Sequence, residues 1–300
     1  MTDHQKASEN IASESSGMSN YEAKRSDAMI AAVERSLTKT GKVRSGDDLV
    51  VGVDLGTAYI VLVVLDRKRK PVATEMQFAQ VLKDGVVVDY IGALRIVREL
   101  KQKLEDRLGV ELTRAAIAMP SGTPESECKA HRHIVESTGM DVINMLDEPT
   151  AANRVLNIQN GAVVDIGGGT TGLSIFKDGE VVYTMDEATG GTHLTLVLAG
   201  NYHKSFEDAE AFKKNSDNHR EVVGVVRPVI EKMGTIVHRH IQGYDVNDIF
   251  LVGGTTCLPE FEEIVEKQTG VRTRKPKNPF LVTPLGIAIS ALEALEAEEK

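Results

Sequence analysis

Two similar glycine-rich stretches decide the fold of this chain: Val53-Asp54-Leu55-Gly56-Thr57 and Val164-Asp165-Ile166-Gly167-Gly168-Gly169-Thr170-Thr171. Apolar residues precede and follow each stretch, an order that indicates two β-strands joined by a tight turn. Glycine is needed in such a turn because it adopts positive φ angles and lets the backbone approach a ligand closely. The repetition predicts two duplicated half-molecules that hold one polyphosphate from opposite sides.

The residue types in both turns suit phosphate and magnesium binding. Successive backbone N–H groups form a nest for anions, and an aspartate beside a threonine hydroxyl suits hydrated Mg²⁺. An ordinary hairpin turn would explain one Asp-x-Gly stretch, but two matched stretches and a later glycine pair favour a ligand site. The chain contains no Gly-x-x-x-x-Gly-Lys-Ser/Thr motif and no Gly-x-Gly-x-x-Gly that opens a helix after a strand. The expected phosphate site is therefore neither a P-loop nor a dinucleotide fingerprint.

The composition is that of a globular protein with an excess of acidic residues. The chain has 300 residues, of which 41% are hydrophobic and 26% are charged, enough for one large or two medium domains. The formal net charge of −9 argues against a nucleic-acid partner or an anionic membrane surface. Cys128 and Cys257 lack metal-ligand spacing, so we expect free thiols in a reducing compartment. We expect that no apolar run reaches membrane-spanning length, and the polar N-terminus does not resemble a signal peptide, so we expect a cytoplasmic location.

Residues 1–47 are predicted to form a flexible N-terminal tail that carries a short amphipathic helix. The first 20 or so residues are rich in Ser, Glu and Asn, and we expect them to be disordered. From residue 21 to about residue 38, apolar side chains recur at helical spacing and form a narrow stripe, made by Met29, Ile30, Val33 and Leu37. Two interpretations stay open: the helix docks on a partner, or it packs back on its own domain.

Two α/β halves are predicted to follow the tail, at residues 48–158 and 159–300. Each half begins with a meander of strands and continues with helices and parallel-type strands. A strand meander that is followed by helices and further strands, twice over, predicts two α/β units with a cleft between them.

Five motifs resemble those of the actin/Hsp70/sugar-kinase superfamily and follow its order over residues 49–290. The two glycine-rich stretches are similar to its first and second phosphate segments. The other three are similar to the linker between the halves, the adenosine segment and the second connecting helix: Asp147–Ala152, Val252–Pro259 and Pro284–Ala288. The resemblance implies an actin/Hsp70-type fold, in which duplicated ribonuclease H-like domains enclose a central nucleotide cleft.

Within that superfamily the chain most resembles the EutJ family, the Hsp70-like proteins of bacterial ethanolamine-utilisation operons. The stretches Asp186–His193 and Val229–Met233 carry this likeness. It implies a cytoplasmic, chaperone-like protein that binds ATP or ADP with Mg²⁺. It also implies a protein partner, either ethanolamine ammonia-lyase or a component of the bacterial microcompartment, and hence association with that compartment.

The resemblance also assigns roles to individual residues. Asp54 and Asp165 would hold Mg²⁺ or its waters, one from each half. Thr170 would lie at the γ-phosphate, and Glu148 would orient the attacking water as a general base; complementing the helix macrodipole is the alternative role for Glu148. Asp165 would act with Glu148 and Thr170 in catalysis. Further contacts to the nucleotide would come from Gly56, Thr57, Ala58, Gly167, Gly168, Gly169, Thr171, Gly190, Gly191, Gly253, Gly254 and Thr255.

Two departures from the Hsp70 pattern lower the expected rate of hydrolysis. Hsp70 places a lysine from an extra subdomain in the phosphate site, but too few residues separate Val81 from Ala116 here to build that subdomain. Gly172 stands where Hsp70 has an acidic residue. Since a missing cationic contact at a transferring phosphoryl group costs a factor of about 10³ or more, we expect good MgATP binding and slow hydrolysis.

These features favour a slow nucleotide switch that alters its affinity for a partner. Three alternatives stay open: a polymerising actin-like scaffold, a degenerate actin fold that binds partners without hydrolysing nucleotide, and a small-molecule kinase. The kinase would need a substrate-binding insertion, for which the short first half leaves little room.

Overall fold

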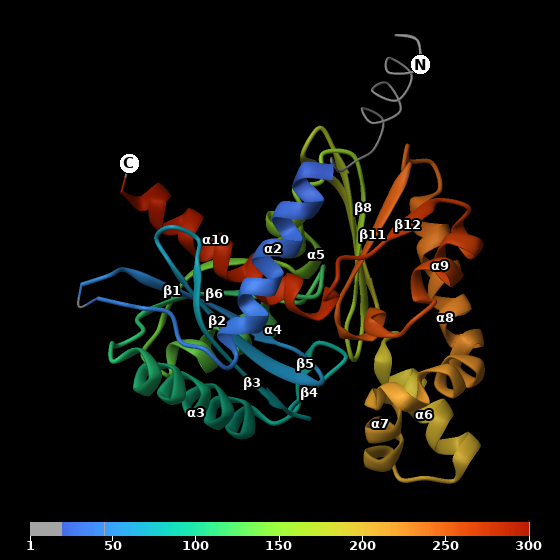
Figure 1. The fold of residues 1–300 in the computed structure, drawn as a ribbon, viewed down its shortest axis with the longest axis horizontal. Coiled ribbons are helices and arrows are strands. Elements are labelled where there is room, and N and C mark those ends of the chain that lie inside the picture. The colour runs from blue at the N-terminus through green and yellow to red at the C-terminus, as the bar shows by residue number, and fades with distance from the viewer. Residues whose placement is uncertain (1–19, 45, 300) are drawn as a thin grey trace.

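Two five-stranded sheets of the same strand order form the centre of the protein (Figure 1). The computed structural model describes residues 20–44 and 46–299. Each sheet combines a three-stranded antiparallel meander with two further strands that pair parallel, in the orders β3-β2-β1-β6-β7 and β10-β9-β8-β11-β12. The predicted α/β fold with two duplicated units is therefore confirmed.

The first sheet is accompanied by three helices, of which two lie between its strands in the sequence and one follows the last strand, and by a small ribbon of two short strands. The strands are β1 (Leu49–Leu55), β2 (Tyr59–Asp66), β3 (Pro71–Phe78), β6 (Arg114–Met119) and β7 (Asp141–Asp147), and the ribbon is β4 (Leu82–Lys83) and β5 (Val86–Val87). The helices are α3 (Tyr90–Leu108), α4 (Glu125–Glu136) and α5 (Glu148–Leu156).

The second sheet has the same arrangement with longer helical insertions. Its strands are β8 (Gly161–Ile166), β9 (Thr171–Lys177), β10 (Glu180–Glu187), β11 (Asp248–Val252) and β12 (Arg272–Arg274). Its helices are α6 (Gly191–Tyr202), α7 (Phe206–Lys214), α8 (His219–Ile241), α9 (Phe261–Thr269) and α10 (Val282–Glu298). Short 3₁₀ turns occupy Ser216–Asn218, Gly254–Cys257 and Pro279–Leu281.

Three apolar clusters hold these elements together. One lies between the first sheet and α3 and α4, one lies between the second sheet and α6, α8 and α9, and the third surrounds α5 and α10 between the sheets. Strands that are covered on both faces consist of continuous apolar runs, and every residue of β8 and β11 is buried. Because the central cluster contains residues of both sheets, the two halves share one core.

Helices α5 and α10 cross in close backbone contact at the centre of this cluster. At Gly286 of α10, an added Cβ atom would overlap the carbonyl group of Ala151 in α5. At Gly52 of β1, an added Cβ atom would overlap the backbone of Ala288 in α10 and lie 2.7 Å from the Pro284 carbonyl oxygen. Glycine is required at both positions because the three backbones approach too closely for any side chain.

Helix α2 (Asn20–Ser36) packs on the folded core and does not form part of a flexible tail. Ile30 and Val33 of its apolar stripe are buried in the central cluster. The Ser26 hydroxyl donates a hydrogen bond to the Val155 carbonyl of α5 at 2.8 Å, and the helix also packs along β3. The expectation of a flexible tail is therefore wrong for this segment, because its apolar stripe is covered by its own chain.

Polar contacts attach α2 to segments from both halves. The Arg107 guanidinium of α3 donates to the Ser36 carbonyl at 2.7 Å, and the backbone N–H of Lys277 donates to the Asp27 carboxylate at 3.2 Å. Residues 1–19, for which the sequence predicts disorder, lie outside the described residues. Helix α2 thus spans the junction between the two halves.

Helix α10 corrects the expectation that no apolar run reaches membrane-spanning length. The stretch Pro279–Glu298 is long and apolar enough to cross a membrane, with a mean hydropathy of 1.5, but 72% of its most apolar window is buried inside the fold. It packs against β1, β2, β6 and α5. Its apolar composition is therefore that of a core helix.

We expect Gly286→Ala to lower the free energy of unfolding by about 2 kcal/mol, because the added methyl group forces α5 and α10 apart. Gly200→Ala in α6 is the matched control: nothing lies within 4 Å of the added Cβ atom there, and alanine favours a helix interior. Urea unfolding of both variants measures the difference. Equal stability of Gly286→Ala and the wild type would contradict the close crossing.

Ile30→Ala should lower the free energy of unfolding by about 2–4 kcal/mol, because the Ile30 side chain is 1% exposed and its removal leaves a cavity between α2 and the core. Arg25→Ala, at an exposed position on the same helix, is the control. If both variants unfold at the wild-type urea concentration, α2 does not contribute to the folded core.

Candidate functional site

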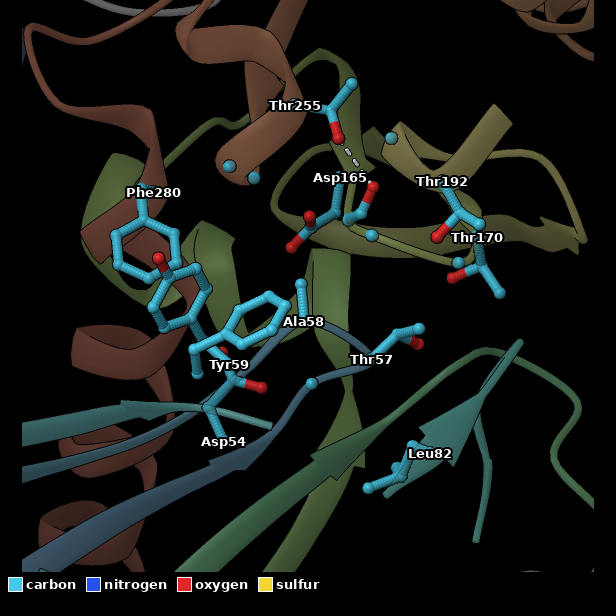
Figure 2. A pocket seen from close by; sticks show the side chains of 18 of the residues that line it. Asp54, Thr57, Ala58, Tyr59, Leu82, Asp165, Thr170, Thr192, Thr255 and Phe280 are labelled. Carbon is cyan, nitrogen blue, oxygen red and sulfur yellow. Dashed lines mark hydrogen bonds between the residues drawn. The ribbon is translucent and has the colours of Figure 1, made fainter. Parts of the chain in front are cut away.

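A cavity of about 690 Å³ opens where the glycine-rich turns of the two halves meet (Figure 2). It lies at the ends of β1, β8 and β11, next to the first residues of α5 and α6. Most of the predicted site residues line it: Asp54, Gly56, Thr57, Ala58, Glu148, Asp165, Gly167, Gly168, Gly169, Thr170, Gly191, Gly253, Gly254 and Thr255. The predicted central cleft is therefore present.

The two turns touch each other through backbone that carries almost no side chain. An added Cβ atom at Gly168 would lie 3.1 Å from the Cβ atom of Ala58, and one at Gly169 would lie 2.7 Å from the Thr57 hydroxyl oxygen. Figure 2 shows Thr57 and Ala58 of the first turn opposite Thr170 of the second. Glycine keeps the backbone N–H groups of the second turn accessible, which is what an anion-binding nest requires.

The later glycine segment supports the second turn. Gly253 has a φ of 90°, and an added Cβ atom there would overlap the Asp165 carboxylate. The Thr255 hydroxyl donates to the Gly167 carbonyl at 2.7 Å, and the Thr283 hydroxyl donates to Asp165. The segment therefore approaches Asp165 closely and supplies one wall of the cavity, while Thr283 of α10 orients the Asp165 carboxylate.

Two predicted contact residues lie outside the cavity. The Thr171 side chain is fully buried and its hydroxyl donates to the Thr189 carbonyl at 2.6 Å, because β9 begins there and directs this side chain away from the cleft. Gly190 packs beneath the second turn, where an added Cβ atom would lie 2.7 Å from the Gly168 carbonyl oxygen. Both residues support the turn, and the structure corrects the expectation that they line the ligand site.

Helix capping positions Glu148 at the cavity. The Asp147 carboxylate caps α5 by accepting the Thr150 N–H at 2.9 Å, and Pro149 occupies the first turn, where its missing N–H costs nothing. Glu148 is the first residue of the helix and lines the cavity. The two interpretations of Glu148, helix-terminal charge and functional carboxyl, are thus compatible in one geometry.

Three carboxyl groups of the cavity have raised pKa values because the surrounding protein removes much of their hydration. Burial and the nearby Asp165 raise the pKa of Asp54 to about 7. Burial raises the pKa of Asp165 to about 6, against the hydrogen bond from Thr283. Burial and the charges of Asp165 and Asp54 hold the pKa of Glu148 well above its usual range. Carboxylates that repel one another in this way favour a bound cation.

The donor set fits Mg²⁺ that is held largely through water. Among residues 20–44 and 46–299, no three His, Cys, Asp or Glu side chains are arranged to hold a metal ion directly. Mg²⁺ commonly keeps several waters and binds through one or two carboxylates and the phosphates of its substrate. Asp54 from β1 and Asp165 from β8 provide one carboxylate from each half.

Asp186 does not line the cavity, but its carboxyl group lies close enough to Asp165 for the two charges to repel, and it was not among the predicted site residues. In the β9–β10 pairing, Asp186 stands opposite Gly172, and its Oδ1 atom lies 3.5 Å from an added Cβ atom there. This oxygen is buried and has no hydrogen-bond partner among the described residues. Burial raises the pKa of Asp186 to about 7. Strand β10 therefore places a carboxyl group beside Gly172, the position at which Hsp70 has an acidic residue.

A polar group from α6 and α7 was also missed. The Lys213 ammonium donates to the Thr195 hydroxyl at 2.7 Å and to the Gly191 carbonyl at 3.0 Å, and it lies 2.7 Å from the Glu210 carboxylate. Glu210 and Lys213 line the cavity. In the sequence they form an ordinary helical pair three residues apart, and only the fold shows that this pair is buried.

An aromatic wall completes the cavity. Tyr59 packs edge-on against Phe78 and Phe280, with ring centroids 5.6 and 5.4 Å away. All three rings line the cavity, and Figure 2 shows Tyr59 beside Phe280. Lys83 of the β4–β5 ribbon lies at the rim, so a lysine does reach the cleft despite the short first half. A cavity with an apolar wall and a few placed polar groups is typical of a small-molecule site.

Comparison with known proteins identifies the family. The chain is 43% identical to the ethanolamine utilization protein EutJ of Escherichia coli (strain K12) over 249 residues, which are 83% of this chain and 88% of the relative. The chain belongs to the EutJ family. The crystal structure of EutJ from Carboxydothermus hydrogenoformans is 47% identical, covers 89% of this chain and 99% of that chain, and has a TM-score of 0.84. The resemblance to the EutJ family is thereby confirmed.

More distant proteins share the fold of the EutJ family. The structure of MreB5 of Spiroplasma citri bound to ADP has a TM-score of 0.69 at 17% identity, and covers 84% of this chain and 98% of that chain. A family model described as type IV pilus assembly protein PilM matches residues 139–293. The actin-like fold predicted from the five motifs is therefore confirmed.

In metal-free protein, Asp54→Asn should raise the free energy of unfolding at pH 8 by on the order of 2 kcal/mol and change it little at pH 4. The pKa of Asp54 is raised from 3.8 to about 7 in the folded state. Between these values the unfolded chain has already lost a proton that the folded protein keeps, so the wild type loses stability as the pH rises.

Urea unfolding in the presence of a chelator at both pH values measures this effect. Asp178→Asn, on the exposed β9–β10 turn, is the matched control. A gain for Asp54→Asn that is the same at both pH values would show that the carboxyl group is not destabilised by its surroundings.

Proposed function

We propose that this member of the EutJ family binds ATP and ADP with Mg²⁺ in the cleft and acts as a slow nucleotide switch on a protein partner. The proposal rests on one observation: two glycine turns, one from each half, face each other beside the buried carboxyl groups. The E. coli relative is named for ethanolamine utilization. In this proposal the partner would be ethanolamine ammonia-lyase or a component of the microcompartment, and the protein would act in the cytoplasm in association with it.

The phosphates would lie between the two turns. Backbone N–H groups of Gly168 and Gly169 would bind them from one side and those of Thr57 and Ala58 from the other, since these segments line the cavity in mutual contact. The Thr170 hydroxyl would face the terminal phosphate. Bound Mg²⁺ would neutralise phosphate charge and thereby offset the repulsion within the carboxyl cluster.

The carboxyl groups of the site would bind the metal ion and activate the attacking water. Asp54 and Asp165 would hold the waters of the metal ion, one from each half. Glu148 would accept a proton from the attacking water, because its carboxyl group lines the cavity and its raised pKa makes it a stronger base than an ordinary glutamate. Asp186, opposite Gly172, would add a second acceptor for that water.

The nucleoside would occupy the part of the cavity between the aromatic wall and α7. The flat rings of Tyr59 and Phe280 offer apolar contact to a base. The Glu210 carboxylate and the Lys213 ammonium would exchange hydrogen bonds with ribose hydroxyl groups. Gly253 and Gly254 would let the backbone approach the adenosine.

Slow hydrolysis follows from the placement of the cations. The Lys213 ammonium already pairs with Glu210 and donates hydrogen bonds to Thr195 and the Gly191 carbonyl, so it would stabilise a phosphoryl group only weakly. Lys83 lies at the exposed rim of the cavity, where water and salt screen its charge. Weak cationic stabilisation of the transition state leaves binding intact and reduces the rate.

Thermal unfolding with and without saturating MgATP tests the proposal. At about 100 times the Kd, binding adds roughly 2.7 kcal/mol to the free energy of unfolding, which corresponds to a shift of several degrees. Asp165→Asn should abolish the Mg²⁺-dependent part of the shift, and Asp178→Asn should keep it. An absent shift in the wild type would contradict nucleotide binding and favour the degenerate actin fold.

The polymerising scaffold remains the second candidate. The actin-like fold shared with MreB5 is compatible with it, but a filament needs a head-to-tail contact between copies. Sedimentation of the full chain after addition of MgATP distinguishes the two: a pellet favours the scaffold, and protein that stays monomeric at high concentration favours the switch.

A further inference from the structure

One side chain of α7 reaches across the cavity to the other half of the protein. The Lys214 ammonium lies 4.7 Å from the centroid of the Tyr59 ring and 4.2 Å from that of the Phe78 ring. Tyr59 belongs to β2 and Phe78 to β3, both in the first sheet, whereas α7 follows the second sheet along the chain. All three side chains line the cavity. This contact therefore joins the two sides of the cleft.

The aromatic side of the contact is fixed in place. Tyr59 packs edge-on against Phe78 and against Phe280, which belongs to the 3₁₀ turn before α10. Phe78 is 42% exposed, a high value for so large an apolar side chain. A cation over the face of such a ring gains electrostatic attraction and covers apolar surface. The rings are thus held by their own packing, whereas the Lys214 side chain is 38% exposed.

We propose that Lys214 and the rings of Tyr59 and Phe78 form a gate that sets how fast nucleotide enters and leaves the cleft. The inference rests on the proposed function only in that it takes the ligand of the cleft to be a nucleotide. When Lys214 leaves the rings, α7 is free to move away from the first sheet. When it returns, the lysine and both rings close over the bound ligand.

The gate is coupled to the polar group that would face the ribose. Lys214 lies 3.1 Å from the Glu210 carboxylate, and Glu210 also pairs with Lys213, the residue before Lys214. Movement of α7 therefore displaces the Glu210–Lys213 pair together with Lys214. Opening the gate and releasing the nucleoside become one event, because the same short helix carries both groups.

The strength of the gate suits a switch. A cation over one partly exposed ring contributes modestly, and Lys214 has two rings and a side chain that is 38% exposed. Loss of the contact should therefore accelerate nucleotide dissociation about three- to tenfold. A gate of this strength slows release but still opens without a second protein.

The chain contains a matched control for the contact. Lys204 lies 5.7 Å from the centroid of the Phe212 ring. Phe212 is on α7 and Lys204 lies in the loop between α6 and α7, so this cation–ring pair stays on one side of the cleft. Lys204→Met removes a contact of the same kind from the same region without affecting the bridge across the cavity.

Stopped-flow fluorescence measures the dissociation rate of N-methylanthraniloyl-ADP from the full chain after mixing with excess ADP. Lys214→Met should raise the rate about three- to tenfold. Lys214→Arg, which keeps the cation, should stay near the wild type, and Lys204→Met should not change the rate. Phe78→Leu should act like Lys214→Met, and the double variant should be no faster than either single one. Equal rates for Lys214→Met and Lys204→Met would overturn the gate.

Hydrogen exchange without nucleotide provides a second readout that does not depend on ligand binding. In Lys214→Met, peptides that cover residues 76–90 and 206–214 should exchange faster than in the wild type; in Lys204→Met, peptides over 76–90 should be unchanged. If the wild type binds no nucleotide but the exchange pattern appears, the proposed function fails, the Lys214 contact across the cleft stands, and its role in nucleotide release is overturned. If residues 76–90 exchange alike in both variants, the gate is overturned whatever the protein binds.

Discussion

The close crossing of α5 and α10 is the constraint on which the rest of the structure depends. Gly286 allows α10 to lie against the Ala151 carbonyl, and Gly52 allows β1 to lie against α10. Helix α5 begins with Glu148, and α10 begins next to the turn that carries Phe280. The geometry of the crossing therefore sets the distance between the two sheets and, through it, the contact between the glycine turns.

Stability and ligand binding oppose each other in the cleft. Buried carboxyl groups with raised pKa values and a glycine-lined cavity add little to the stability of the empty protein. The apolar clusters around the cleft supply that stability. In the proposed complex, a bound cation would give the same carboxyl groups a favourable partner. A site of this kind couples occupancy to conformation, because the ligand removes a repulsion that the fold otherwise sustains.

The fold and most of the cleft could be predicted because their signals are local in the sequence. The backbone of the two glycine-rich stretches and of the Gly253–Gly254 pair adopts conformations and close contacts that few other residues allow. The sequence alone therefore predicts tight turns at these positions. Thr171 was assigned to the ligand as the last residue of the second stretch and Gly190 as part of a separate glycine pair, but strand alternation and packing under the turn direct both away from the cavity.

What the sequence could not reveal depends on contacts between distant segments. The packing of α2 could not be predicted without knowing that β3 and α5 lie beside it. Its apolar stripe alone is equally compatible with binding to a partner protein. Glu210 and Lys213 have the spacing of a surface ion pair, and only the position of α7 over Gly191 buries them. Asp186 became relevant through its register opposite Gly172, which is a property of strand pairing and not of any motif.

The crossing of α5 and α10 also bears on which part of the molecule would move most if the two halves changed their relative orientation. In a rotation about this crossing, displacement grows with distance from the axis. Figure 1 shows α6 and α7 at the end of the second half that is remote from α5 and α10. A small rotation at Gly286 therefore becomes a larger translation at α6 and α7. A protein that binds this remote tip would sense the occupancy of the cleft mechanically, without touching the nucleotide.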